Sequence, residues 1–155
     1  LEEAAGALSQ YEGFDRRSRV VQAPGGWTVF DDTYNASPDA MAGALRGLAA
    51  MKAEGRKIAV LGDMRELGEA CRAEHERIGR TVAEAAPAML VTVGEDSRII
   101  QQAAVQGGYS GETHHFTGSG EAAGFLAGEV RPGDLILVKG SRALEMERVV
   151  ERLVG

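Results

Sequence analysis

Carboxylate, amide and aromatic residues gather at residues 31–38, which read DDTYNASP. An apolar segment at 27–30 precedes them and apolar residues at helical spacing follow, so they are predicted to join a strand to a helix. Ser37 suits the N-cap of that helix and Pro38 its first position. In open α/β sheets ligands bind at such a junction, because helix N-termini aim backbone N–H groups into the crevice there. A plain turn, in which Asp and Asn satisfy local backbone groups, is the alternative.

Three further stretches carry polar or glycine residues directly after a predicted apolar strand. They are LGDMRELG at 61–68, GED at 94–96 and KGSR at 139–142. Right-handed crossover connections bring the carboxyl ends of successive parallel strands to the same edge of a sheet. We therefore expect one edge to hold the functional site.

The elements that would position these groups alternate along the chain. Strands are predicted at 19–22, 27–31, 57–61, 89–93, 114–116 and 135–138. Helices are predicted at 1–13, from 38 to near 55, at 71–85, 97–106 and 121–129, and from Ser141, as N-cap, toward the end of the chain. Continuous apolar strands are typical of a parallel sheet covered on both faces. The predicted fold is α/β, a Rossmann-like doubly wound, mainly parallel sheet with an N-terminal β-hairpin at one edge and helices on both faces.

Size and composition exclude several classes of protein. The 155 residues fit one domain, and a net charge of −6 without a basic cluster argues against nucleic-acid binding. No apolar run approaches the roughly 20 residues that a membrane helix needs. We expect a soluble, cytoplasmic, monomeric protein with no membrane partner. Because the first residue is Leu1, we also expect the chain to be part of a longer protein.

Neither common nucleotide-binding fingerprint is present, since the chain has no G-x-G-x-x-G after a strand and no G-x-x-x-x-G-K-[ST]. The chain alone is therefore predicted to lack a triphosphate cradle. His75 shares a helix face with apolar residues, which favours a half-buried structural histidine over a general base. Neighbouring His114 and His115 lack metal-ligand spacing, and the single Cys71 is expected to be a buried apolar side chain, so no metal site is predicted.

The blocks DDTYNASP, LGDMRELG and KGSR, with His75 between the second and third, resemble in order the carboxyl-terminal domain of the Mur ligase family. The resemblance is to the branch that uses ATP to join D-alanyl-D-alanine to UDP-N-acetylmuramoyl-tripeptide. It implies that residues 16–155 form this domain and that residues 1–15 end a central domain. That central domain would carry the P-loop and bind most of the ATP and Mg²⁺, and a further amino-terminal domain would bind the UDP-sugar. The isolated chain would then have no catalytic residues of its own and would be inactive.

The resemblance also implies roles for individual residues. The nucleotide would be bound by Arg17, Asp32, Tyr34 and Asn35. Arg17 is matched by counting back from the first block, although the glycine that usually precedes the family arginine is Arg16 here, and Arg19 is the competing candidate. The carboxylate of D-alanyl-D-alanine would be bound by Lys139, Ser141 and Arg142. Asp63 and Glu66 would either hold the dipeptide's ammonium group or brace their loop.

Two other functions compete with this interpretation. In a receiver-like signalling module, Asp31 and Asp32 would be the acid pair, Asp63 the phosphoacceptor and Lys139 the switch lysine. The strand order along the chain argues against it, because Asp63 ends the strand directly after the acid pair, whereas receivers place another strand between them. A non-catalytic nucleotide-binding α/β module is the second alternative.

Overall fold

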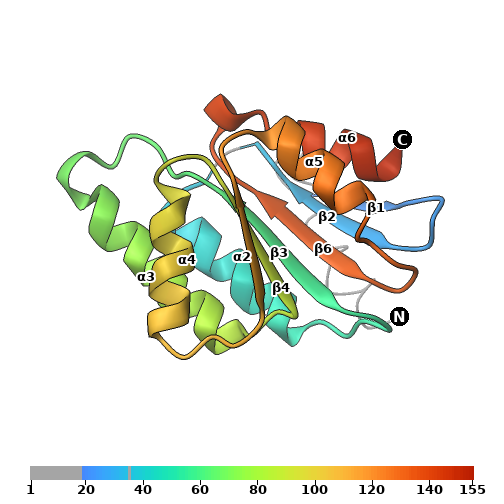
Figure 1. Ribbon diagram of the computed structural model, residues 1–155, viewed down its shortest axis with the longest axis horizontal. Coiled ribbons are helices and arrows are strands. Elements are labelled where there is room, and N and C mark those ends of the chain that lie inside the picture. The colour runs from blue at the N-terminus through green and yellow to red at the C-terminus, as the bar shows by residue number, and fades with distance from the viewer. Residues whose placement is uncertain (1–18, 35) are drawn as a thin grey trace.

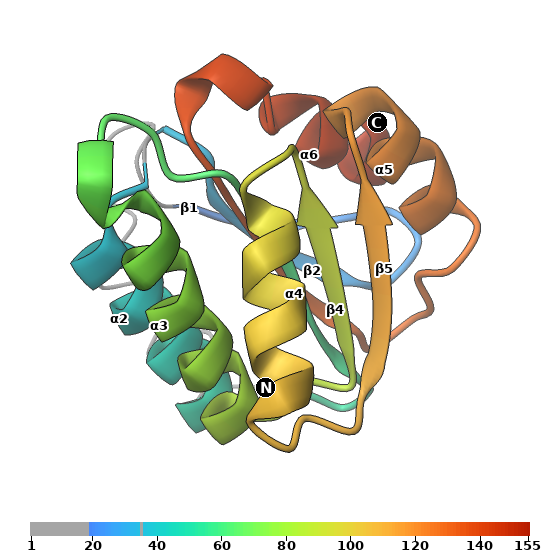
Figure 2. The same ribbon diagram turned by 60° about the vertical axis from the view of Figure 1, so that its left-hand side comes forward.

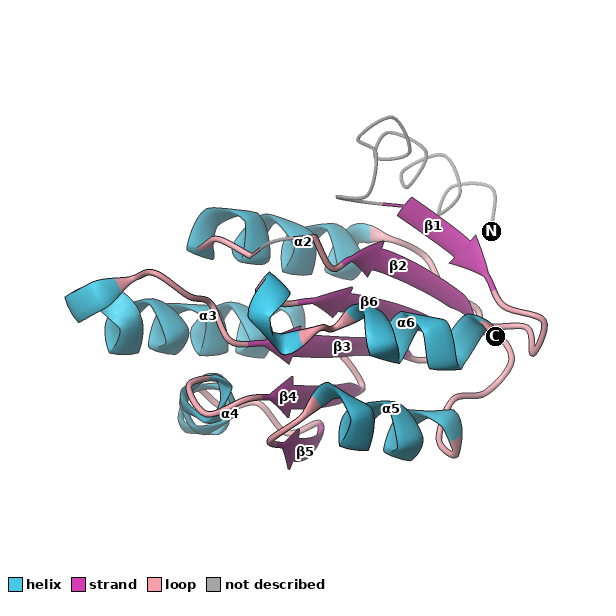
Figure 3. Cartoon of the chain, turned by 90° about the horizontal axis from the view of Figure 1, so that it is seen from above, coloured by secondary structure: helices cyan, strands magenta, loops and turns pink. Residues whose placement is uncertain are grey.

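The computed structural model describes residues 19–34 and 36–155, and within them a six-stranded sheet in the order β1-β2-β6-β3-β4-β5 (Figure 3). The predicted first helix, Arg17 and Asn35 lie outside the described residues. The strands are β1 Arg19–Gln22, β2 Thr28–Asp32, β3 Lys57–Gly62, β4 Met89–Val93, β5 Glu112–Phe116 and β6 Leu135–Lys139. β1 pairs antiparallel with β2 and every other neighbouring pair is parallel. The predicted sheet with a hairpin at one edge is confirmed.

Helices cover both faces of the sheet (Figure 1). One face carries α2 Pro38–Ala50, α3 Cys71–Ala85 and α4 Ser97–Gln106, and the other carries α5 Ser119–Ala127 and α6 Glu147–Val154. Two short 3₁₀ helices, η1 Gly68–Ala70 and η2 Arg142–Leu144, follow the ends of β3 and β6. This is the predicted doubly wound arrangement.

Alternation along each strand divides the core into two clusters. In β2 and β3, Phe30 and Leu61 pack with α2, α3 and α4, whereas Val29 and Val60 pack with α5 and α6, and all four are at most 1% exposed. Successive side chains of a strand point to opposite faces, so a continuously apolar strand must be covered twice. The sequence pattern therefore predicted the layers correctly.

The start of α2 agrees with its sequence signals, but its end does not. The Ser37 hydroxyl accepts a hydrogen bond of 3.2 Å from the Ala40 N–H, and Pro38 is the first helical residue. The helix ends at Ala50 instead of continuing to near Gly55. Gly55 instead donates its N–H to the carbonyl of Gly133, at 2.8 Å, which ties this turn to the start of β6.

The chain after β6 also differs from the prediction. Ser141 makes no side-chain capping bond, η2 intervenes, Glu145 adopts a left-handed conformation with φ of 53°, and α6 begins only at Glu147. The left-handed Glu145 interrupts the helical path that starts after Ser141, and the Ser141 N–H is donated to the Asp63 carbonyl, directly after β3, at 3.0 Å. The expected apolar stripe of the last helix is present, with Met146, Val149, Val150 and Leu153 all buried.

Candidate functional site

The carboxyl ends of the parallel strands meet at one edge, where the loops after β3 and β6 also lie (Figure 2). β6 lies between β2 and β3, and its last residue, Lys139, is in register with Asp32 on one side and Leu61 on the other. The strand order thus places the first, second and fourth polar stretches of the sequence beside one another. This is the predicted site edge.

An ion pair joins two of the predicted ligand-binding residues. Lys139 Nζ lies 2.6 Å from Asp32 Oδ2, and the two side chains are only 4% and 12% exposed. Removing one member of such a pair destabilises the protein, because the other charge is then buried without compensation. Asp32, expected to bind the nucleotide, and Lys139, expected to bind the dipeptide carboxylate, therefore hold each other in place.

A pocket of about 280 Å³ opens at the same edge of the sheet, and the residues that line it do not include this pair. It is lined by Arg19, Asp31, Thr33, Tyr34, Arg142 and Glu147. Asp31 organises one wall, because its Oδ2 accepts a bond of 2.8 Å from Arg19 Nε while its Oδ1 accepts bonds from the Thr33 N–H and hydroxyl. Arg19, the competing candidate for the family arginine, is thus on the pocket. Asp31 was not among the predicted site residues, although the Asp-Asp doublet was a signal for it.

Tyr34 and Arg142 meet across the mouth of the pocket. The guanidinium carbon of Arg142 lies 5.3 Å from the centroid of the Tyr34 ring, within range of a cation–π interaction. Tyr34 is one of the two large apolar side chains that the described residues leave exposed. Tyr34, which was predicted to bind nucleotide, and Arg142, which was predicted to bind dipeptide, therefore line the same pocket.

The GDMRELG loop places Asp63 in a fully buried position. Its Oδ1 accepts a hydrogen bond of 2.7 Å from the Ser97 N–H at the start of α4, and its Oδ2 lies 3.3 Å from an Arg65 nitrogen. A carboxylate at a helix N-terminus is stabilised by the helix dipole. These contacts favour the bracing alternative for Asp63.

The outward side chains of the same loop are charged. Arg65 has a side chain 49% exposed, and Glu66 is exposed with a left-handed φ of 62°. A non-glycine residue in that conformation is uncommon and is often found at functional sites. The Glu66 carboxylate is therefore accessible to solvent in a conformation that the loop imposes. Arg65 was missed from the sequence, although its place between two candidate acids was a signal.

The histidines occupy the structural positions expected of them. His75 is completely buried, deeper than predicted, and hydrogen-bonds backbone groups through both ring nitrogens. His115 contacts the Thr92 hydroxyl at 2.7 Å, and burial, with the positive charge of Arg98, lowers the pKa of its imidazole. His114 pairs with Glu112 on the edge strand. Of these, only His75 lies against the GDMRELG loop.

Cys71 is half-buried instead of buried, because it begins α3 directly after η1. Burial, with the negative charge of Asp96, raises the pKa of its thiol, which leaves it protonated and weakly nucleophilic near neutral pH. Cys71, His75 and Asp96 form the one group of three potential metal ligands among the described residues. A thiol and an imidazole do not suit Mg²⁺, which prefers oxygen ligands, so this cluster is no candidate for the magnesium of an ATP site.

The geometry opposes the receiver-like alternative. A phosphoacceptor must be reachable by its phosphodonor, but Asp63 is 0% exposed and one of its oxygens is bonded to α4. Lys139 is paired with Asp32 at 2.6 Å. Asp63 is therefore out of reach of a phosphodonor in this structure.

Comparison with known proteins defines the class to which this fold and site belong. Residues 16–142 match the family described as Mur ligase, glutamate ligase domain, and the chain belongs to this family. It is 37% identical over 171 residues to the UDP-N-acetylmuramoyl-tripeptide--D-alanyl-D-alanine ligase of Mycobacterium leprae and 39% identical over 174 residues to that of Mycobacterium bovis. These matches cover 100% of this chain but 33% and 34% of the relatives, so the chain spans about a third of their length.

Solved structures agree. The chain superposes on MurF from Acinetobacter baumannii with a TM-score of 0.76 at 32% identity, and on MurF ligase from Thermotoga maritima in complex with ADP with a TM-score of 0.72 at 30% identity. Each match covers 89% of this chain and 30% of the other. In the part of the chain that the structure describes, no helix combines the length and apolar character needed to span a bilayer.

Proposed function

We propose that this chain is the carboxyl-terminal domain of an ATP-dependent amide ligase that joins D-alanyl-D-alanine to UDP-N-acetylmuramoyl-tripeptide during peptidoglycan precursor synthesis. Residues 16–155 would form the domain and residues 1–15 the end of a central domain. The relatives that match the chain along its whole length carry this activity in their names. The observation that carries the proposal is the contact between Tyr34 and Arg142, which unites the two predicted binding surfaces.

The nucleotide side of the site is the pocket beside β2. Asp31, Thr33 and Tyr34 line it, whereas Asp32, between them in the sequence, is not among the lining residues and pairs with Lys139. Its volume of about 280 Å³ is just below the range of about 300–1,000 Å³ that is usual for a small-molecule site. Such a pocket suits part of a nucleotide, with the remainder covered by another domain. We assign to it the ribose and base of ATP, and we place the phosphates and Mg²⁺ on the central domain.

The dipeptide side is the loop after β6. Arg142 supplies an exposed guanidinium that can pair with a carboxylate in bidentate fashion. The Ser141 hydroxyl is buried and has no hydrogen-bond partner among the described residues. A buried hydroxyl left in that state costs about 1–3 kcal/mol, which a ligand carboxylate would relieve. Lys139 adds positive charge behind them, and Glu66 is the candidate partner for the dipeptide's ammonium group.

This domain would act by positioning. ATP would activate the terminal carboxylate of the tripeptide as an acyl phosphate, which the dipeptide amine attacks before phosphate leaves from the tetrahedral intermediate. Holding an amine in near-attack geometry can supply about 7–11 kcal/mol. Arg142 and Ser141 would bind the carboxylate at the far end of the dipeptide. This would set the distance between the dipeptide amine and the acyl phosphate. Closure of the domain over the central one would exclude water that would otherwise hydrolyse the acyl phosphate.

The test is phosphate release by the full-length protein and by the isolated chain. We expect release from the full-length protein to require ATP, UDP-N-acetylmuramoyl-tripeptide and D-alanyl-D-alanine together, with L-alanyl-L-alanine as the matched control that does not substitute. The isolated chain should release none. Phosphate release that does not depend on the dipeptide, or turnover by the isolated chain, would overturn the proposal.

We also propose that the protein is located in the cytoplasm, where ATP is available, and that it is a monomer. Light scattering would check the oligomeric state.

A further inference from the structure

His75 connects two backbone segments through its ring. Nδ1 lies 2.7 Å from the Cys71 carbonyl oxygen, one turn earlier in α3, and Nε2 lies 3.1 Å from the Met64 nitrogen in the GDMRELG loop. The imidazole is 0% exposed. The imidazole can therefore affect a ligand only through the protein groups that it contacts.

The two partners fix the tautomer. A carbonyl oxygen can only accept a hydrogen bond, so Nδ1 must carry the proton and donate it to Cys71. A backbone N–H can only donate, so Nε2 must be unprotonated and accept the bond from Met64. A histidine in the other tautomer, or a protonated one, would leave the Met64 N–H facing a second donor.

Met64 is the point at which the loop is fastened to the core. Its side chain is 1% exposed and belongs to the cluster under α2, α3 and α4, while its N–H is held by His75. Its neighbours face different environments, because Asp63 is buried against α4 and Arg65 is half exposed. A shift at Met64 would therefore move Arg65 and Glu66 relative to the loop after β6.

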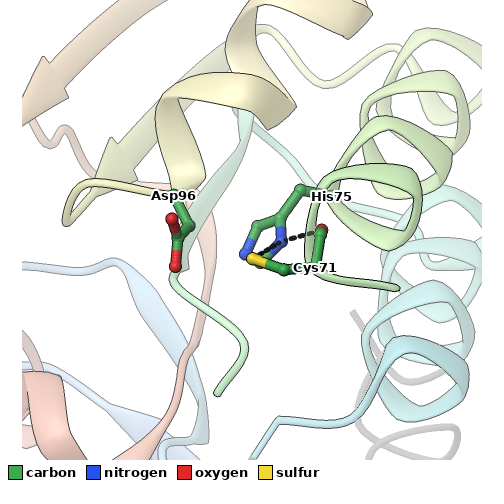
Figure 4. Close-up of side chains that lie close together, drawn as sticks. All are labelled: Cys71, His75 and Asp96. Carbon is green, nitrogen blue, oxygen red and sulfur yellow. Dashed lines mark hydrogen bonds between the residues drawn. The ribbon is translucent and has the colours of Figure 1, made fainter. Parts of the chain in front are cut away.

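A metal site is the rival use of the same cluster. The ligand atoms of Cys71, His75 and Asp96 lie within 4.8 Å of one another, and Figure 4 shows Asp96 facing the other two from the start of α4. Cys71 Sγ is 3.6 Å from His75 Nδ1, but that nitrogen is the protonated one. The remaining lone pair, on Nε2, is engaged by Met64. A metal could bind only by breaking the loop's anchor.

We propose that His75 is a positioning residue for the incoming dipeptide, acting through the Met64 N–H to set the place of Arg65 and Glu66. This inference rests on the proposed function, in which the loop after β3 faces the dipeptide. His75, a buried side chain of α3, would then affect the binding of the dipeptide but not that of the nucleotide. The nucleotide pocket is lined by residues of β1, β2 and the segment after it, η2 and α6.

The experiment compares His75→Gln and His75→Leu in the full-length protein. Glutamine can place its carbonyl oxygen near the position of Nε2 and keep an acceptor for Met64, whereas leucine fills the space without one. Displaced Arg65 and Glu66 would bind the dipeptide less tightly, so we expect H75L to raise the KM for D-alanyl-D-alanine by about 10-fold or more. The KM for ATP should stay within twofold, and H75Q should recover most of the dipeptide affinity.

Ile78→Ala is the matched control, because Ile78 is a fully buried residue of the same helix that does not bond the loop. It should lower stability without raising the dipeptide KM selectively. Equal rises in the KM for ATP and dipeptide in H75L, no recovery in H75Q, or the same dipeptide effect in I78A would each show a purely structural role and overturn the proposal.

Two readouts do not depend on activity. Nitrogen NMR of the full-length protein labelled in histidine should show His75 protonated at Nδ1 and unprotonated at Nε2; the opposite tautomer would overturn the proposal. Addition of Co²⁺ should give no thiolate-to-metal absorption, and an absorption that Cys71→Ser abolishes would assign the cluster to metal binding instead. If the wild-type protein lacks dipeptide-dependent phosphate release, the proposed function fails, while the tautomer still tests the His75 anchor.

Discussion

Lys139 Nζ lies 2.6 Å from Asp32 Oδ2, between the ends of two neighbouring parallel strands. Asp32 lies in the sequence between Asp31 and Thr33, which line the pocket, and Lys139 ends the strand before the loop that carries Ser141 and Arg142. Because both side chains of the pair are almost completely buried, the relative position of the two binding surfaces depends on this pair.

The pair should make a measurable contribution to stability. Lys139→Met leaves the Asp32 carboxylate buried without its cation, and we expect the free energy of unfolding in urea to fall by about 3 kcal/mol. Adding Asp32→Asn removes the stranded charge, so the double variant should be destabilised by less than the sum of the two single variants. Strict additivity would show that the two groups do not interact.

Arg142 should act on the dipeptide more than on the nucleotide. Arg142→Ala in the full-length protein removes a bidentate carboxylate partner, and we expect the KM for D-alanyl-D-alanine to rise on the order of 10-fold. Arg142→Lys should recover part of this loss, since it retains charge without the planar fork. A rise confined to the KM for ATP would instead assign Arg142 to the nucleotide pocket.

Gly94, directly after β4, is predicted to be essential for the position of Asp63. Its φ is +108°, and a Cβ there would lie 2.5 Å from Asp63 Oδ1. We expect Gly94→Ala to lower the free energy of unfolding by about 2–3 kcal/mol, through both backbone strain and displacement of the carboxylate. Gly108→Ala is the matched control, since its φ is +97° but no atom lies within 4 Å of the added carbon. It should cost only about 1–2 kcal/mol, and equal losses in thermal or urea unfolding would argue that Asp63 is not displaced.

Acid stability should depend on Asp134, far from the site at the start of β6. Despite an opposing effect of burial, its bonds to Arg56 and to backbone N–H groups lower the pKa of the Asp134 carboxyl below its ordinary value of 3.8. A carboxyl whose folded-state pKa is lowered stabilises the fold above its unfolded pKa, and this contribution is lost as pH falls through the folded value. Asp134→Asn should therefore be less stable than wild type at pH 7, and the difference should narrow below about pH 4. A constant difference down to pH 2 would contradict this assignment.

The strands and layers could be predicted from the sequence because their signals are local. The run Met89–Val93 is apolar except for Thr92, and the structure places β4 at these residues. Ser37 and Pro38 marked the start of α2 for the same reason. The start of α6 could not be predicted, because the break before it lies at Glu145, whose left-handed conformation is uncommon for a residue other than glycine.

The site was predictable as a set of strand ends but not as a set of contacts. The sequence placed Asp32 and Lys139 at one edge, yet their pairing follows from the insertion of β6 beside β2, which the order of strands along the chain does not reveal. The depth of His75 is likewise a tertiary property. Its spacing with Ile78 predicted the correct helix face, whereas its bond to Met64 depends on how the loop folds back over α3.

The central claim is that one edge of this domain binds both the nucleotide and the dipeptide. Its most direct test is a crystal structure of the full-length protein with a non-hydrolysable ATP analogue and D-alanyl-D-alanine. We predict the ribose and base against Tyr34 and Asp32, and the dipeptide carboxylate within hydrogen-bond distance of Ser141 Oγ or the Arg142 guanidinium. Ligands bound away from the carboxyl ends of β2, β3 and β6 would contradict the account.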